Sequence, residues 1–339
     1  MIKLRDSFRV FSYLNVYRLW NVIILRFSFH LSKITRRNFH FGMPSTLSIE
    51  PTTACNLGCP ECPSGLKQFS RPTGKLDLDF HERMLAQIKS SVFYINYYFQ
   101  GEPFLHPHFL TLIAQAKKSK IYTSTSTNAH FINQKKANEI VSSGLDRLII
   151  SIDGLTQQTY EQYRVNGKLN KVIEASKLLV ESKTRTNSKT PHLIFQFLAV
   201  KPNEHEVPEI FDLAREIGID EVRIKTAQLY DYKNGNRLMP DNSKYSRYVK
   251  RKDGTFKLKG RQGNHCWRMW SSSVFTWDGG VVPCCFDKDA SHILGSLKDK
   301  PFKEIWNAEK YKEFRQSILN AREQIDICKN CSEGSKVWV

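Results

Sequence analysis

Six short apolar runs recur between residue 44 and about residue 230, and segments with helical periodicity lie between them. The runs cover residues 46–50, 91–99, 120–125, 146–152, 192–200 and 221–225. The run from Asp146 to Ile152 contains three consecutive apolar residues, Leu148 to Ile150, as in strands that are buried on both faces of a parallel sheet. Strands that alternate with helices predict an α/β fold with a parallel sheet and with helices outside it.

The intervening segments carry signals of helix start and stop. Pro107 precedes a segment in which Phe109, Ile113 and Ala116 share one helical face. Apolar positions between Val207 and Ile217 recur at helical spacing and stop at Gly218, a residue that favours the left-handed end of a helix. We therefore expect six β–α units over residues 44–230.

Residues 1–43 are basic and aromatic, with eight Lys or Arg and a single acidic residue, Asp6. The stretch from Tyr13 to Leu31 is apolar over most of a helical circumference, but Arg18 and Arg26 interrupt it, so it does not predict a membrane span. The interpretation that we favour is a helix packed against the body of the protein. The alternative is peripheral contact of residues 13–37 with an anionic membrane surface.

The alternation of predicted strands and helices ends near residue 230. Residues 231–264 are polar and predict a linker with a small hairpin around Asp253 and Gly254. From residue 265 cysteines recur and the composition changes again. We therefore divide the chain into an N-terminal segment (1–43), a core (44–230), a linker (231–264) and a C-terminal domain (265–339).

Composition and charge exclude some classes of protein. Aromatic residues make up 12% and charged residues 25% of the 339 residues, as in a folded globular protein and unlike a disordered one. The formal net charge of +18 invites a nucleic-acid interpretation. Much of the excess is lysine spread over helix faces and no RNA-binding motif is found, so we expect no nucleic-acid partner. A non-catalytic basic metalloprotein that binds nucleic acid or a membrane is the alternative from another class.

The eight cysteines fall into two groups, at residues 55–62 and 266–331. Such tight local spacings suit metal ligation in a reducing compartment better than a disulfide framework. The early apolar stretch is not followed by a small-residue cleavage site, so we expect no signal peptide. Together these features predict a cytoplasmic location.

The first group lies in Pro51-Thr-Thr-Ala-Cys55-Asn-Leu-Gly-Cys59-Pro-Glu-Cys62, just after the first expected strand. Three thiolates at this spacing can face one metal centre, and no fourth Cys or His lies nearby. Three ligands on a four-cornered cluster leave one iron open for another ligand. A zinc site with a distant fourth ligand is the alternative.

This spacing resembles the signature of the radical S-adenosylmethionine (radical SAM) superfamily. The resemblance implies that Cys55, Cys59 and Cys62 hold a 4Fe–4S cluster whose fourth iron chelates S-adenosylmethionine. It also implies a six-stranded partial TIM barrel, (βα)6, which agrees with the count of β–α units. Reductive cleavage of S-adenosylmethionine to a 5′-deoxyadenosyl radical, which then takes a hydrogen atom from a substrate, is the implied chemistry.

Working residues of a parallel barrel lie at the carboxyl ends of its strands. Gln100-Gly101-Glu102 follows the second expected strand and resembles the superfamily's Gly-Gly-Glu motif, with Gln in place of the first Gly. By the same resemblance, the residues expected to bind S-adenosylmethionine are Gln100, Gly101, Glu102, Ser126, Ser151, Asp153 and Arg164. We also expect Gln196 or Lys225, on the last two strands, to point into the substrate cavity.

The second group has the pattern C-x12-G-x4-C followed by C-x2-C, and resembles the Twitch half of a SPASM/Twitch extension of radical SAM enzymes. Cys266, Cys284, Cys328 and Cys331 suffice to ligate one auxiliary 4Fe–4S cluster completely. A four-cysteine zinc site is the alternative. Residues 274–282 predict a tight hairpin, and residues 302–318 predict a helix, which together suggest a small α+β domain of one hairpin and helices.

Cys285 remains unassigned in this pattern. It is expected to be a small buried side chain or to exchange places with Cys284 as a ligand. A more specific hypothesis is that Cys285 donates a hydrogen atom to the substrate, as in a radical epimerase.

A single auxiliary cluster resembles the arrangement of radical SAM dehydrogenases that oxidise a secondary alcohol on a ring. We therefore expect an oxidoreductase that acts on a sugar-like or cyclitol-like small molecule and takes electrons from flavodoxin or ferredoxin. The alternative is a maturase that modifies a peptide, which we rank second because only 43 residues precede the core.

Overall fold

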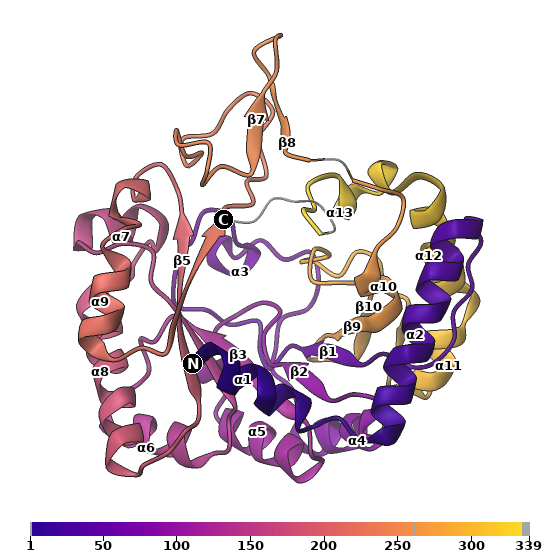
Figure 1. Ribbon diagram of the computed structural model, residues 1–339, viewed down its shortest axis with the longest axis horizontal. Helices are drawn as coiled ribbons and strands as arrows, with labels where there is room; N and C mark the ends of the chain where they lie inside the picture. The colour runs from indigo at the N-terminus through magenta and orange to yellow at the C-terminus, as the bar shows by residue number, and fades with distance from the viewer. Residues whose placement is uncertain (1, 261, 334–339) are drawn as a thin grey trace.

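The computed structural model describes residues 2–260 and 262–333. Six parallel strands stand next to one another in chain order, and helices cover their outer face (Figure 1). These strands are β1 (Thr46–Ile49), β2 (Tyr94–Asn96), β3 (Tyr122–Thr127), β4 (Arg147–Ser151), β5 (His192–Ala199) and β6 (Glu221–Thr226). The fold is therefore the predicted α/β partial TIM barrel, although β2 is much shorter than the apolar run from residue 91 to residue 99.

The outer helices bury one apolar face each against the sheet, as their periodicity predicts. Leu112, Ile140 and Leu179, for example, are fully buried in the main core. The helices are α4 (Leu78–Ile88), α5 (Phe109–Lys118), α6 (Gln134–Ser142), α7 (Gln157–Tyr163), α8 (Leu169–Arg185) and α9 (Ile210–Ile217), with the short α3 (Pro63–Leu66), η1 (Pro103–Leu105) and η2 (Glu204–Glu206) in the loops. As predicted, α9 ends at Gly218, which has a φ of 92°.

The C-terminal hairpin extends the barrel sheet. Strand β9 (Ser272–Phe275) pairs in parallel with β1, so that Thr46 stands opposite Ser272. Strands β10 (Gly280–Val282) and β11 (Gly295–Ser296) then add in antiparallel fashion. The sheet thus has nine strands in the order β11-β10-β9-β1-β2-β3-β4-β5-β6. This pairing satisfies the backbone groups along an edge of β1 that would otherwise be exposed.

The remaining C-terminal helices pack beside this hairpin, at the right of Figure 1. They are α10 (Trp267–Ser271), α11 (Phe302–Asn307), α12 (Glu309–Ala321), η3 (Arg322–Gln324) and α13 (Asp326–Lys329). The single helix expected over residues 302–318 is broken, because Ala308 adopts an extended conformation between α11 and α12.

Residues 231–264 contain the expected hairpin, β7 (Tyr248–Lys250) and β8 (Phe256–Leu258), which projects at the top of Figure 1. The segment also does more than link two parts of the chain. Leu238, Met239 and Tyr248 join Leu57 and Cys59 in one buried apolar cluster. This segment therefore covers part of the first cysteine loop.

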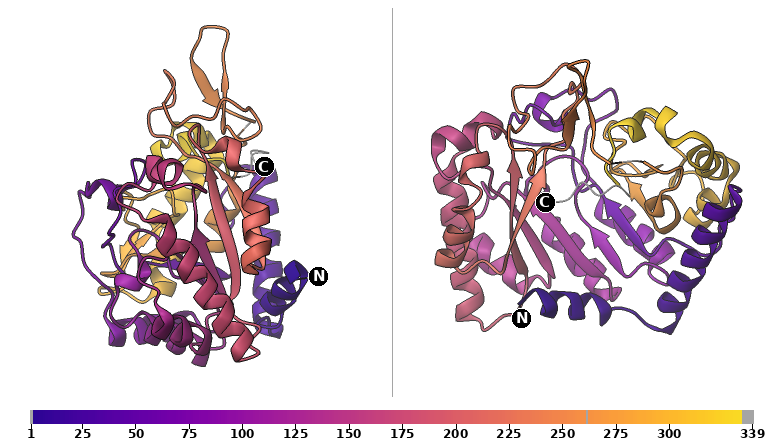
Figure 2. Two further views of the ribbon diagram at one scale, coloured as in Figure 1. Left: turned by 90° about the vertical axis from the view of Figure 1, so that its left-hand side faces the viewer. Right: turned by 45° about the horizontal axis from the view of Figure 1, so that its top comes forward.

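The N-terminal segment forms two helices, α1 (Ile2–Phe11) and α2 (Val16–Thr35), which lie on one side of the molecule (Figure 2). Leu25 and Phe29 of α2 are buried, and Phe29 packs edge-on against Trp267 and Trp270. The segment is thus packed against the body of the protein on one face. In the described part of the chain, no helix has both the length and the apolar character of a membrane span.

One close approach fixes the turn after β2 against the first cysteine loop. Gly101 has a φ of 76°, and a Cβ atom there would lie 2.2 Å from the carbonyl oxygen of Thr52. The next residue, Glu102, donates its backbone N–H to the carbonyl of Ala54 at 2.7 Å. Only glycine fits this position, because a side chain would be strained and would also collide with backbone.

We predict that Gly101→Ala destabilises the protein far more than Gly254→Ala. Both glycines have positive φ, but a Cβ atom at Gly254, in the turn between β7 and β8, would meet nothing within 4 Å. Gly254→Ala should cost only the left-handed strain of about 1–3 kcal/mol, whereas Gly101→Ala adds a clash. Urea unfolding of the two anaerobically purified variants measures the difference, and equal losses would contradict the close approach.

Candidate functional site

The first cysteine group lies in the loop between β1 and α3. Cys62 is the residue that precedes α3, and its backbone N–H donates to the carbonyl of Cys59 at 3.3 Å. Gly65 lies so close to Cys59 that a Cβ atom would come within 2.6 Å of the Cys59 backbone nitrogen. The loop is therefore tightly folded, and the three cysteines are free thiols. Burial raises the pKa of the Cys55 thiol to about 11.

A pocket of about 290 Å³ opens beside this loop, at the carboxyl ends of the barrel strands. It is lined by all three cysteines and by six of the seven residues expected to bind S-adenosylmethionine, namely Gln100, Gly101, Glu102, Ser126, Ser151 and Arg164. The hydroxyl oxygens of Ser126 and Ser151 lie 3.5 Å apart. Gln196 lines the same pocket, whereas Lys225 lies on another surface groove.

Glu102 is buried and holds neighbouring strands together. Its carboxylate accepts hydrogen bonds from the Thr127 hydroxyl and from the backbone N–H of Asn128, both at 2.7 Å. Burial raises the pKa of this carboxyl, while these two donors act in the opposite direction. A carboxylate has further lone pairs, so Glu102 can accept from a ligand ammonium in addition.

Asp153 is the one expected ligand-binding residue outside the lining. Its carboxylate is fully buried and accepts from the guanidinium of Arg164 and, at 2.7 Å, from the backbone N–H of Leu198. Arg164 in turn points another nitrogen, Nη1, at the sulfur of Cys59 at 3.8 Å. Asp153 therefore orients Arg164, which stands between the buried acid and the cysteine loop.

The second cysteine group gathers between the hairpin of β9 and β10 and the last helix. Cys266 precedes α10, Cys284 follows β10, and Cys328 and Cys331 lie in and just after α13. Cys266, Cys328 and Cys331 are buried. Burial raises the pKa of the Cys328 thiol to about 12.

Arg322 lies among the sulfurs of this group. Its Nη2 atom donates to the Cys331 sulfur at 3.4 Å, and its Nη1 atom donates to the carbonyl of His265 at 2.9 Å. Burial lowers the pKa of Arg322, but the sulfurs of Cys266, Cys331 and Cys328 outweigh it, so the net shift is upward. A fixed cation here compensates negative charge on thiolates.

These surroundings fit iron–sulfur clusters. Within the described ranges no three His, Cys, Asp or Glu side chains converge closely enough to hold a single metal ion. A cluster spreads its ligands over several metal atoms, so such convergence on one point is not what it requires. Arg322 also keeps a buried Nε atom without a partner among the described residues, which would suit an acceptor on a cluster.

Cys285 lies next to residues that line the pocket beside the first cysteine loop, among them Phe99 and Lys288. It packs against a small apolar cluster that includes Phe99, Val274 and Val282. The Arg268 guanidinium approaches its sulfur at 3.9 Å. The sulfur does not line the pocket beside the first cysteine group.

Sequence reasoning missed Lys288 and Tyr98, which both line the pocket. Lys288 lies in the loop after Cys284 and Cys285, and its ammonium lies near Cys62 and Cys285 and 4.6 Å from the ring centre of Tyr230. Burial lowers the pKa of Lys288, an effect that Cys62 and Glu61 partly offset. Lys288 has no local motif, because it reaches the pocket through the pairing of β9 with β1. Tyr98 lies just after β2, two residues before Gln100, inside the apolar run that predicted this strand.

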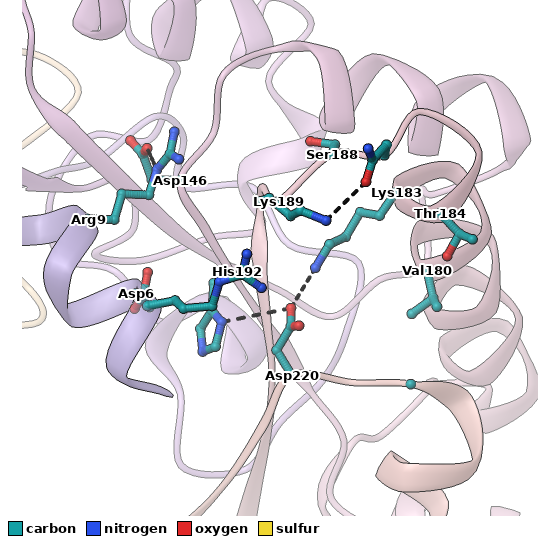
Figure 3. A pocket seen from close by; sticks show the side chains of 13 residues that line it. Asp6, Arg9, Asp146, Val180, Lys183, Thr184, Ser188, Lys189, His192 and Asp220 are labelled. Carbon is teal, nitrogen blue, oxygen red and sulfur yellow. Dashed lines mark hydrogen bonds and ion pairs between the residues drawn. The ribbon is translucent and has the colours of Figure 1, made fainter. Parts of the chain in front are cut away.

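A second pocket, of about 480 Å³, lies at the opposite end of the barrel strands (Figure 3). Two ion pairs lie in its lining. Lys183 contacts Asp220 at 2.6 Å, and Arg9 of α1 contacts Asp146 at 2.6 Å. This network attaches α1 to the barrel. It lies at the end of the strands opposite to the first cysteine loop.

Two family models match this chain. The model of the radical SAM superfamily matches residues 49–214, and that of SPASM, an iron–sulfur cluster-binding domain, matches residues 266–332. The chain is a radical SAM enzyme with a C-terminal SPASM domain. The family implies a 4Fe–4S cluster with S-adenosylmethionine at the first site and auxiliary iron–sulfur binding in the SPASM domain.

Relatives of this radical SAM enzyme have diverse activities. It is 24% identical over 317 residues to the PqqA peptide cyclase of Gluconobacter oxydans, covering 87% of this chain and 84% of that protein. It is 22% identical to the AdoMet-dependent heme synthase of Methanosarcina barkeri, covering 80% and 85%. At such distances the substrate does not follow from the comparison.

Solved structures agree with the fold. BtrN in complex with AdoMet and 2-DOIA superposes with a TM-score of 0.55 at 17% identity, covering 87% of this chain and 95% of that chain. SuiB of Streptococcus suis bound to the precursor peptide SuiA gives a TM-score of 0.64 at 16% identity, covering 91% and 75%. Both support the partial barrel with a small SPASM-like domain.

We predict that Arg322→Gln lowers the reduction potential of the SPASM-domain cluster. Loss of a buried cation disfavours the added electron, and a shift of about 60 mV corresponds to a tenfold change in a one-electron equilibrium. Potentiometry followed by electron paramagnetic resonance measures both clusters. Lys329→Gln removes the same charge from an exposed position, where water and salt screen it. Equal shifts in the two variants would contradict the proposed role of Arg322.

Proposed function

We propose that this radical SAM enzyme oxidises a small polar molecule, with a sugar or cyclitol as the preferred substrate class. The observation that carries the proposal is one polar pocket whose lining is shared by the two parts of the chain that bear cysteines. The first cysteine loop forms one wall, and Lys288, from the loop after Cys284, forms another.

We assign the first cluster to Cys55, Cys59 and Cys62, and one auxiliary cluster to Cys266, Cys284, Cys328 and Cys331. When bound, the first cluster supplies the electron that cleaves S-adenosylmethionine and so generates the hydrogen-abstracting radical. The residues of the chain would bind S-adenosylmethionine and orient it. Gln100, Gly101 and Glu102 would face the methionine amino group, whereas Ser126, Ser151 and Arg164 would face its carboxylate or ribose. Asp153 would hold Arg164 in place.

The lining suits a substrate with hydroxyl groups. Gln196, Asn128 and Tyr98 offer amide and phenol groups, and Lys288 offers three N–H donors. Burial raises the pKa of Tyr98 to about 12, so its hydroxyl keeps its proton and can donate. Oxidation of a secondary alcohol to a ketone removes a hydrogen atom, a proton and one further electron. The hydrogen atom goes to the 5′-deoxyadenosyl radical, the proton leaves to solvent through the open pocket, and the SPASM domain is the proposed acceptor of the electron.

A peptide-modifying maturase is the second candidate. Its support comes from the PqqA peptide cyclases and from SuiB with its precursor peptide among the matches. A radical epimerase that uses Cys285 is a third candidate, and the packing of Cys285 among apolar side chains does not favour it. We further propose flavodoxin or ferredoxin as the reductant.

We predict that the anaerobically reconstituted, dithionite-reduced enzyme converts S-adenosylmethionine to 5′-deoxyadenosine. The Cys55/Cys59/Cys62→Ala variant should form none and should lose about half of the protein-bound iron, because one of two four-iron clusters is lost. Liquid chromatography with mass spectrometry and an iron assay measure these quantities.

Panels of cyclitols and of peptides then separate the candidates. A cyclitol or sugar that stimulates 5′-deoxyadenosine formation and loses two mass units would support the oxidoreductase. Stimulation by peptides alone would overturn the small-molecule proposal. Absence of 5′-deoxyadenosine from iron-replete protein across both panels would refute the assigned chemistry of the first site.

We predict that Lys288→Gln raises the KM for the substrate about tenfold or more, as expected when a hydrogen bond from a charged group is lost. Cleavage of S-adenosylmethionine without substrate should stay near the wild-type rate, because Lys288 is not assigned to that ligand. Lys300→Gln is the matched control at an exposed position. An unchanged KM in Lys288→Gln would exclude Lys288 from substrate binding.

A further inference from the structure

The first N-terminal helix turns Asp6 and Arg9 toward the barrel. Asp6 of α1 is buried, accepts from Arg147 Nε at 3.0 Å and also contacts the hydroxyl of Tyr122. Arg9 contacts Asp146 at the bottom of the barrel (Figure 3). With this face anchored, Phe8 and Phe11 point away from the protein and are 71% and 63% exposed.

The second helix is attached to the body largely through polar groups as well. Arg18 is buried, and its guanidinium donates to the carbonyls of Lys89 and Lys120, both at 2.6 Å. Asn21 donates to the carbonyl of Met43 at 2.7 Å, and Ser32 donates to that of Phe39 at 2.7 Å. The buried face of α2 is thus rich in polar side chains.

The outer face of α2 also carries a row of large apolar residues. Val16, Trp20, Ile23, Phe27 and Ile34 recur at helical spacing on one stripe, and each is between 49% and 81% exposed. A globular helix normally turns its apolar stripe inward. Among the large apolar side chains found exposed in the described residues, ten lie between residues 8 and 41 and seven in all the rest. Such a concentration marks a contact surface.

Charge indicates what covers this surface. The single acidic residue of the segment, Asp6, is buried in an ion pair, whereas Arg26, Lys33, Arg36 and Arg37 are exposed on or just after α2. The whole chain carries a formal charge of +18. A second copy would bring like charges together, whereas an anionic lipid surface offers opposite charge and an apolar layer.

We propose that the outer face of α1 and α2 binds peripherally to an anionic membrane. Both helices lie on the same side of the molecule (Figure 2), so the surface can engage without unfolding either of them. The aromatic and aliphatic side chains enter the boundary between headgroups and acyl chains, and the basic side chains contact lipid phosphates. This inference stands independently of the substrate proposed above.

Flotation of the cluster-loaded enzyme with lipid vesicles tests the proposal. The wild-type protein should float with vesicles of phosphatidylcholine and phosphatidylserine, and less with phosphatidylcholine alone. Trp20→Ser/Ile23→Ser/Phe27→Ser should reduce flotation about tenfold or more, since apolar burial and lipid attraction act together. The control Phe131→Ser/Phe211→Ser/Ile293→Ser removes equally large exposed side chains elsewhere and should float as the wild type does.

Cleavage of S-adenosylmethionine should be unchanged in both triple variants, which shows that they are folded. No flotation of the wild type, or equal flotation of the wild type and the α2 variant, would overturn the proposal. Light scattering tests the remaining possibility, which is that a second copy of the chain binds to this surface. A wild-type dimer that the α2 variant converts to a monomer would assign this face to a second copy of the chain and would refute membrane binding.

Discussion

The parallel pairing of β9 with β1 is the constraint on which the site depends. Strand β1 leads directly into the first cysteine loop, and β9 leads through its hairpin to Cys284. Backbone hydrogen bonds between these two strands fix one part of the chain against a part more than two hundred residues away. Because the register is set by a continuous sheet, the walls of the pocket are held by backbone and not by side chains alone.

Each cysteine group has a guanidinium beside it, buried in the case of Arg322 and half-buried in the case of Arg164. Arg164, oriented by Asp153, approaches Cys59, and Arg322, oriented by backbone carbonyls, approaches Cys331. A cluster held by several thiolates carries negative charge, and a nearby fixed cation reduces the cost of burying it. Both arginines stay charged at any relevant pH, which makes them better suited to this task than histidine or lysine.

Much of the barrel and of its first site follows from the sequence. The alternation of apolar runs with helical stripes predicts the parallel sheet, and the spacing of Cys55, Cys59 and Cys62 predicts their shared loop. The strand ends at Gln100, Ser126 and Ser151 converge on one pocket because parallel strands share a carboxyl edge. The β9–β1 pairing is not predictable in this way, since no local pattern records which distant strand completes an edge. Lys288 was missed for the same reason, whereas Tyr98 lies inside the apolar run that predicted β2 and carries no motif of its own.

Helical periodicity does not determine which face of α2 turns inward, and the packing of the helix does. The stretch around α2 is apolar on most sides, so its pattern does not reveal which face turns inward. Carbonyl acceptors for Arg18 decide the orientation, and they come from other parts of the fold.

The segment that carries β7 and β8 packs against the first cysteine loop. Leu238, Met239 and Tyr248 pack with Leu57 and Cys59 in one apolar cluster, and Leu57 and Cys59 also line the pocket. The pocket that reaches Cys59 is also the proposed substrate site. A substrate bound there would therefore obstruct insertion of the cluster.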